Sequence, residues 1–187
     1  MKEFTSKIDE KFNIKRISDI IKKPYSLVHR AITSLLKERF LIKDKQKFLS
    51  LNCKQNLPKL AYIESLRNEG FLKKNKTIAL FVKDVLETIK PDFFIFLIFG
   101  SSLNKKNARD VDVLFIINTK DIGSIEKILT NLASNFSLDF DIRVISVDSA
   151  YEMLNKKNES NIMNETLGKH IIIFGAENYY RILKNVR

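Results

Sequence analysis

The sequence is poor in several residue types that mark other classes of protein. Among its 187 residues there is one cysteine, Cys53, which excludes an internal disulfide framework. Tryptophan is absent, and only three prolines and five glycines interrupt helical and strand patterns. The longest apolar stretch, Phe93 to Phe99, is far shorter than the roughly 20 residues that span a membrane, and the first residues lack a signal-peptide pattern. We therefore expect a soluble, cytoplasmic protein without a membrane partner.

What the sequence has in excess is positive charge, and this charge is unevenly distributed. The formal net charge is +11. Residues 1–90 hold 21 Lys and Arg against 10 Asp and Glu, whereas residues 91–187 hold 12 of each kind. A basic segment beside a neutral one favours an anionic partner for the basic half, above all nucleic acid. The alternative, a Lys-rich composition along the whole chain, does not predict this asymmetry.

Hydrophobic spacing in the basic half predicts two helices separated by a tight turn. The first covers residues 14–22 and carries three isoleucines on one face. After the turn at Pro24, Ser26 has the side chain of a favourable N-cap. The second helix then shows an apolar stripe that runs from Val28 to Leu36. This arrangement predicts a helix-turn-helix.

Two short strand-like runs follow, Phe40 to Ile42 and Phe48 to Leu51, on either side of a charged segment. The charged segment predicts the tip of a hairpin. Helix, turn, helix and hairpin is the order of a winged helix-turn-helix, to which we assign residues 1–55. Within it, the segment 25–32 resembles the recognition helices of winged-helix regulators. The alternative is a winged helix that serves protein contacts or homodimerisation instead of DNA binding.

The resemblance implies where this module would contact double-stranded DNA. In a helix-turn-helix the second helix enters the major groove, and its first residues meet the bases. Arg30 has the geometry to pair with a guanine edge, and lysines of the hairpin would contact phosphates. The candidate DNA-binding residues are Tyr25, Ser26, His29, Arg30, Lys43, Lys45 and Lys47.

The second half predicts an α/β domain, because strand and helix patterns alternate along it. Residues 56–90 are expected to form a helical connector, and residues 91–187 a small domain with a mixed sheet. The run from Phe93 to Phe99 is apolar at every position, so we expect a strand that is buried on both faces. Further strands are expected at residues 111–117, 140–147 and 170–174. The fold class is therefore α+β or α/β, with a winged helix-turn-helix in front of a small mixed-sheet domain.

A constellation of polar residues lies at the ends of two of these expected strands. Asp110 and Asp112 are two positions apart in a strand, so their side chains point to one face. Neighbouring carboxylates repel unless a cation lies between them, and Mg²⁺ often binds one or two carboxylates together with substrate phosphates. Just upstream stand Gly100, Ser101 and Ser102. Glycine there allows a phosphate to approach the backbone, and a serine hydroxyl can donate to it.

A third carboxylate on a neighbouring strand would complete a two-metal site for an in-line displacement. Asp139 and Asp141 both begin the third expected strand and share one face. Asp141 is the first choice and Asp139 the second, and the pattern leaves both open.

Together these residues resemble the DNA polymerase β-type nucleotidyltransferase superfamily, over roughly residues 77–187. The signature of that family is a strand, Gly-Ser, a loop, Asp-x-Asp in a strand, and a third acid on a later strand. The resemblance implies a small nucleotidyltransferase domain that uses Mg²⁺ and a nucleoside triphosphate. By it, the triphosphate would be held by Gly100, Ser101 and Ser102, Mg²⁺ by Asp110 and Asp112, and the attacking hydroxyl would be activated by Asp141.

The loop between the two parts of this signature differs from the family pattern. Leu103-Asn104-Lys105 and Arg109 stand where small members usually have Ala-Arg/Lys-Gly and a serine. We expect a nucleotidyltransferase that transfers a nucleoside monophosphate to an acceptor hydroxyl. The alternative is a transcriptional regulator, or an antitoxin-like protein with a small helical partner, in which the nucleotidyltransferase domain is degenerate.

Overall fold

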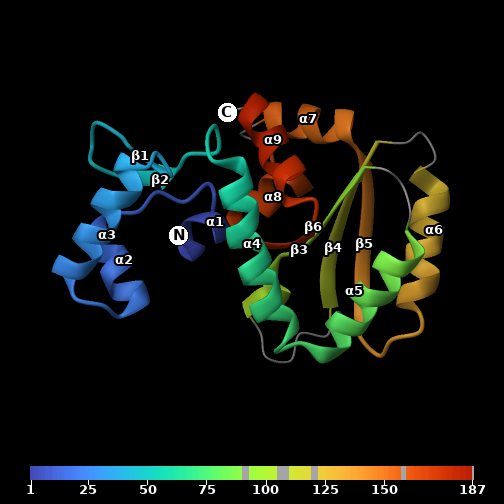
Figure 1. Ribbon diagram of the computed structural model, residues 1–187. Coiled ribbons are helices and arrows are strands. Elements are labelled where there is room, and N and C mark those ends of the chain that lie inside the picture. Colours follow the sequence, from blue (N-terminus) through green and yellow to red (C-terminus); the bar gives the residue numbers. More distant parts are fainter. Residues whose placement is uncertain (90–92, 105–109, 119–121, 157–158, 187) are drawn as a thin grey trace.

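The computed structural model describes residues 1–187 except 90–92, 105–109, 119–121, 157–158 and 187. The described residues form helices and two sheets, one small and antiparallel, the other mixed and four-stranded. Figure 1 shows the small sheet and its helices at one end of the molecule and the large sheet at the other. No helix in these described ranges is long and apolar enough to cross a membrane.

The basic N-terminal part folds in the expected order of helix, turn, helix and hairpin. A short helix that the sequence did not predict precedes them. An isolated bridge from Phe12 to Leu49 joins the chain before the second helix to the hairpin. The elements are α1 Lys2–Ser6, α2 Ile14–Ile21, α3 Tyr25–Lys37, β1 Leu41–Lys43 and β2 Leu49–Leu51.

The expectation that Ser26 caps α3 is wrong, because Ser26 lies inside the first turn of that helix. The N-cap is Pro24, whose backbone is extended (φ −54°, ψ 139°). Its carbonyl accepts the first helical N–H groups, from Leu27 and Val28, each at 3.1 Å. The proline itself therefore sets the start of the helix, and no side chain caps it.

The second part contains a four-stranded sheet with the order β5-β4-β3-β6. The central strand β3 pairs antiparallel with β4 and with β6, whereas β4 and β5 are parallel. All of β3 is buried, which confirms the expected strand with two covered faces. The strands are β3 Phe94–Phe99, β4 Asp110–Ile117, β5 Asp139–Ser146 and β6 His170–Phe174. The helical elements are α4 Leu57–Leu72, α5 Lys76–Thr88, η1 Ser101–Asn104, α6 Ile122–Ala133, α7 Val147–Asn155, α8 Ile162–Gly168 and α9 Ala176–Val186.

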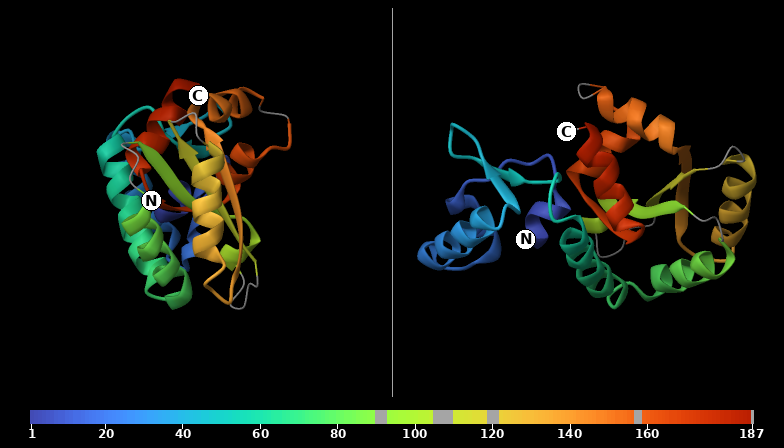
Figure 2. Two further views of the ribbon diagram at one scale, coloured as in Figure 1. Left: turned by 90° about the vertical axis from the view of Figure 1, so that its right-hand side faces the viewer. Right: turned by 45° about the horizontal axis from the view of Figure 1, so that its top comes forward.

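Each face of the sheet has its own hydrophobic core. Alternate residues of β3, such as Phe96 and Ile98, pack with α5 and α6. The intervening residues, such as Ile95 and Leu97, pack with α4, α7, α8 and α9. This second core continues into the N-terminal part, where it includes Phe4 and most of the buried residues of α2, α3 and the hairpin. Figure 2 shows α4 and α9 between the N-terminal elements and the sheet. The segment 56–90 thus supplies one covering helix to each face.

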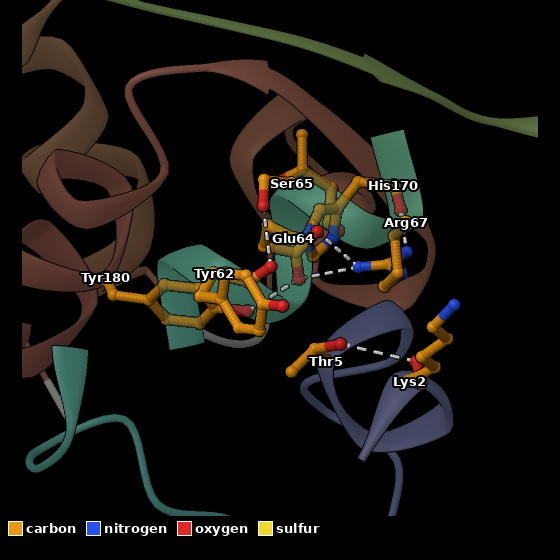
Figure 3. Close-up of polar contacts among 9 residues, drawn as sticks. Lys2, Thr5, Tyr62, Glu64, Ser65, Arg67, His170 and Tyr180 are labelled. Atoms are coloured by element: carbon orange, nitrogen blue, oxygen red, sulfur yellow. Dashed lines mark hydrogen bonds and ion pairs between the residues drawn. The ribbon is translucent and has the colours of Figure 1, made fainter. Parts of the chain in front are cut away.

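A buried polar cluster lies where α4 packs against α9 and the start of β6 (Figure 3). One guanidinium nitrogen of Arg67 donates to both carboxylate oxygens of Glu64 at 2.6 Å, and Tyr180 donates to the same carboxylate at 2.8 Å. Arg67 also donates to the backbone carbonyl of His170 at the start of β6. Glu64 is fully buried and Arg67 nearly so. Removing either partner of a buried pair leaves the other charge unpaired, which is strongly destabilising.

The ring of His170 is also part of this cluster. Its Nδ1 donates to the carbonyl of Thr166 at 2.6 Å, while its Nε2 has no hydrogen-bond partner among the described residues. Burial, and then the nearby positive charge of Arg67, lower the pKa of His170 to about 3. His170 is therefore neutral in the folded protein at any pH near neutrality.

This lowered pKa predicts how stability depends on pH. Below about pH 6.5 the unfolded chain protonates His170 and the folded chain does not, so acidification favours unfolding. The loss approaches about 1.4 kcal/mol per pH unit from this group. We expect His170→Asn, which keeps a donor toward Thr166, to reduce this dependence in urea denaturation between about pH 7 and 5.5. His29→Asn, at an exposed position, serves as the control. Equal pH slopes for His170→Asn and the wild type would contradict the assignment.

Candidate functional site

The turn that follows β3 places a glycine directly against an aspartate of β4. Phe99 pairs with Asp112 across the two strands, and Gly100 follows with a left-handed backbone (φ +79°). A Cβ atom at Gly100 would lie 2.2 Å from Oδ2 of Asp112. Only glycine allows both this backbone conformation and this close approach. The two halves of the sequence motif are therefore in contact.

The parallel pairing of β4 and β5 brings four carboxylates together on one face. Asp110 pairs with Asp139, and Asp112 pairs with Asp141. Paired residues of neighbouring strands point to the same face of a sheet. Asp112 is half-buried, whereas the other three are exposed. Further along the same face, Leu114 and Ile116 enter the hydrophobic core, so the cluster lies where that core ends.

The electrostatics of the cluster agree with its geometry. Partial burial raises the pKa of the Asp112 carboxyl, and the negative charges of Asp141 and Asp110 raise it further. Like charges that affect one another in this way gain from a cation between them. Asp112 is the centre of the group because Gly100, Asp110 and Asp141 all lie around it.

Arg143 is a member of this site that the sequence reading missed. It follows Asp141 by two positions on β5 and therefore lies on the same face. Its Nε is 3.2 Å from Oδ1 of Asp141, and its Nη2 donates to Oδ2 at 3.4 Å. The spacing Asp141-x-Arg143 in an expected strand was the signal that could have revealed the pair.

The structure describes the side chain of only one of the two serines that follow Gly100. Ser102 is half-buried, and its hydroxyl donates to the carbonyl of Phe99 at 3.2 Å, which closes the turn. The backbone of Ser101 begins η1, while its side chain lies outside the described part. Lys105 and Arg109, which differ from the pattern of the nucleotidyltransferase family, also lie outside the described residues. Gly100, Ser102 and the backbone of η1 are thus the described part of the expected phosphate site.

The donor set suits Mg²⁺ if the substrate contributes ligands. In the described ranges, no group of three or more His, Cys, Asp or Glu side chains is arranged to hold a metal ion. Mg²⁺ prefers oxygen ligands and commonly uses one or two carboxylates with substrate phosphates and water. Asp110 and Asp112 could supply such a pair, and the missing side chain at Gly100 makes room for the Asp112 carboxylate. Asp141, paired with Arg143, is not free to join them without losing that contact.

The candidate DNA-binding residues lie apart from this site, on the N-terminal elements. Tyr25, Ser26, His29 and Arg30 are all exposed on the first turns of α3. The Tyr25 and His29 rings are neighbours, with centroids 6.1 Å apart and planes tilted by 32°. Among the described residues, no ion pair or side-chain hydrogen bond joins these four side chains to the rest of the chain.

The hairpin lysines are also exposed and surround an ordered tip. Asp44 accepts from the backbone N–H groups of Gln46 and Phe48 at 3.0 and 2.8 Å. Lys11 donates to the other oxygen of Asp44 at 2.9 Å and lowers the pKa of its carboxyl. Three lysines project around this tip into solvent: Lys43, Lys45 and Lys47.

Comparison with known proteins gives no match. No family model matches the chain, no curated protein is significantly similar to it, and no solved structure resembles it significantly.

The contact between Gly100 and Asp112 predicts the effect of a single methyl group. Gly100→Ala must shift the carboxylate and adopt a strained left-handed backbone, so we expect a loss of about 1–3 kcal/mol of stability. Gly70→Ala, in the last turn of α4, is the matched control because a Cβ there meets nothing within 4 Å, and it should stabilise by at most about 0.5–1 kcal/mol. Urea denaturation compares them, and equal effects of the two substitutions would argue against the contact.

Proposed function

We propose that this chain is an Mg²⁺-dependent nucleotidyltransferase with a DNA-binding N-terminal module. The observation that carries the proposal is the position of Gly100 against Asp112, with Asp110 beside it and Asp141 opposite it. This arrangement brings a glycine turn, whose backbone can bind phosphate, next to carboxylates that can share a cation. The resemblance of the motif to the DNA polymerase β-type family supports the same conclusion.

Each residue of the site has its own role in this proposed reaction. The Gly100 turn binds and orients the triphosphate of a nucleoside triphosphate. Asp110 and Asp112 would hold Mg²⁺, and the cation would supply positive charge that offsets the charge of the phosphates. Asp141 is near enough to Asp112 to accept the proton of the attacking hydroxyl once its contact with Arg143 is released. The products are the acceptor ester of a nucleoside monophosphate and pyrophosphate.

The N-terminal module supports a role for nucleic acid in this function. A helix whose first turns are exposed, followed by a hairpin with three exposed lysines, is the shape and charge that a winged helix presents to a duplex. The positive net charge of the first half agrees with this assignment.

A second function is supported by the ion pair between Asp141 and Arg143. If that pair persists when nucleotide is bound, and Asp139 does not take the place of Asp141, the domain binds nucleotide without turnover. The chain would then be a DNA-binding transcriptional regulator, or an antitoxin-like protein, on a degenerate nucleotidyltransferase domain. Nucleotide binding alone does not separate the two functions, whereas release of pyrophosphate does.

The first test is calorimetric titration with ATP, GTP, CTP and UTP, with and without Mg²⁺. We expect Mg²⁺-dependent binding of at least one nucleotide, and its loss in the Asp110→Asn/Asp112→Asn double variant, because the cation loses both ligands. Asp148→Asn, at an exposed position on α7, is the control and should bind like the wild type. Absence of binding to every nucleotide up to about 1 mM, the upper end of common substrate affinities, would refute nucleotidyl transfer.

The DNA-binding part is tested by the salt dependence of binding to a generic duplex. Replacing Lys43, Lys45 and Lys47 by alanine removes three phosphate contacts, so we expect weaker binding and a salt slope smaller by up to about 2.7. The control variant removes three exposed lysines elsewhere: Lys73, Lys83 and Lys184. If both triple variants weaken binding equally, net charge alone explains the affinity and the hairpin has no special role.

A further inference from the structure

The two edges of the four-stranded sheet differ in how they are covered. At the edge strand β6, side chains of α4 bind the backbone, since Asn68 donates to the carbonyl of Ile173 at 3.1 Å and Arg67 donates to the carbonyl of His170. The other edge strand, β5, pairs only with β4 in the described part of the chain. A strand edge without a partner presents backbone N–H and C=O groups with which a strand of another chain can pair.

The position of this edge in the molecule suits a contact between two copies of the chain. β5 and α6 lie at the end opposite to the N-terminal elements (Figure 1), and Figure 2 (left) shows them side by side. Residues 91–187 carry as many acidic as basic residues, whereas the excess of positive charge lies in residues 1–90. A contact through β5 therefore joins two neutral ends and keeps the basic parts apart, which limits charge repulsion.

The charges of β5 are complementary to a second copy of the same strand. Asp141 and Arg143 are exposed, two positions apart, on one face of the sheet. If a two-fold axis at Ile142 relates two antiparallel β5 strands, Asp141 of each copy lies directly opposite Arg143 of the other. Within one copy Nε of Arg143 is already 3.2 Å from Oδ1 of Asp141. Each of the four charges then has two neighbours of opposite sign, and directly opposite pairs of this kind stabilise a sheet.

The same charges select one register of this pairing. A two-fold axis at Asp141 or at Arg143 would place that residue opposite itself, and like charges that are directly opposite are destabilising. An axis between two residues would oppose side chains that belong to different faces of the sheet. With the axis at Ile142, the other face aligns Phe140 with Val144 and Ile142 with Ile142 of the second copy, all apolar.

We propose that two copies of this chain associate through antiparallel pairing of their β5 strands, which joins the two sheets into one continuous sheet. The interface is isologous, because the same strand serves both copies. It is small, since one strand from each copy forms it, so the association is weak and depends on concentration. The inference does not depend on nucleotide transfer. Because the pairing engages Asp141, it would compete with any role of that carboxylate in turnover.

The test is sedimentation velocity of the full chain at concentrations up to about 0.5 mM. We expect the wild type to show a monomer–dimer equilibrium. The single variants Asp141→Arg and Arg143→Asp each give β5 two like charges, so each should weaken self-association by about tenfold or more. An equimolar mixture of these two variants should form a heterodimer, because opposite charges again lie opposite each other. The doubly substituted chain, Asp141→Arg/Arg143→Asp, should self-associate like the wild type.

The exposed pair of Glu177 and Arg181 on α9 provides matched controls. Glu177→Arg and Arg181→Asp make the same changes in net charge, and they should leave the association of the wild type unchanged. Thermal melting checks that each variant is folded. A wild-type chain that stays monomeric at every concentration would overturn the inference. Single β5 variants that associate as strongly as the wild type, or a mixture of them that stays monomeric, would overturn it equally.

Discussion

The structure depends above all on the pairing of β3 with β4, because this pairing orders both cores and the candidate site. β3 is buried along its whole length and separates the two cores of the sheet. Its antiparallel register places Phe99 opposite Asp112, and the turn that follows brings Gly100 onto that carboxylate. A shift of one residue would exchange the faces of every side chain in the strand. The burial of the apolar side chains of β3 thus fixes the strand register, and the register fixes the positions of Gly100 and Asp112.

The N-terminal module is joined to this sheet by a shared interior. The core that begins at Phe4 continues to Leu183 near the end of α9, and the Glu64–Arg67 pair lies within the junction. Arg67 contacts the carbonyl of His170, and His170 pairs with Phe99, the residue before Gly100. The part proposed to bind DNA and the part proposed to bind nucleotide therefore share packed residues, which is the physical condition for one to affect the other.

The negative charges of the candidate site are partly balanced within the chain. Four carboxylates on one face would repel one another, and the described chain provides Arg143 as a counter-ion at one edge. Both the transferase and the degenerate regulator are compatible with this pair, and they differ in whether a third carboxylate, Asp141 or Asp139, takes part in turnover.

The sequence by itself determined the features that depend on local periodicity. The apolar run of β3, the common face of Asp110 and Asp112, and the basic first half were all readable, because strand geometry and charge counts need no distant partner. Ser26 was misplaced as a cap because Pro24 competes for the same helix start. Only the tertiary structure decided which charges are buried and which carboxylates meet. Glu64 reads as one more charge of an exposed helix until Tyr180, far along the chain, covers it, and Asp141 becomes the neighbour of Asp112 only through the parallel register of β5. Such contacts are set by packing between distant segments, which no local pattern encodes.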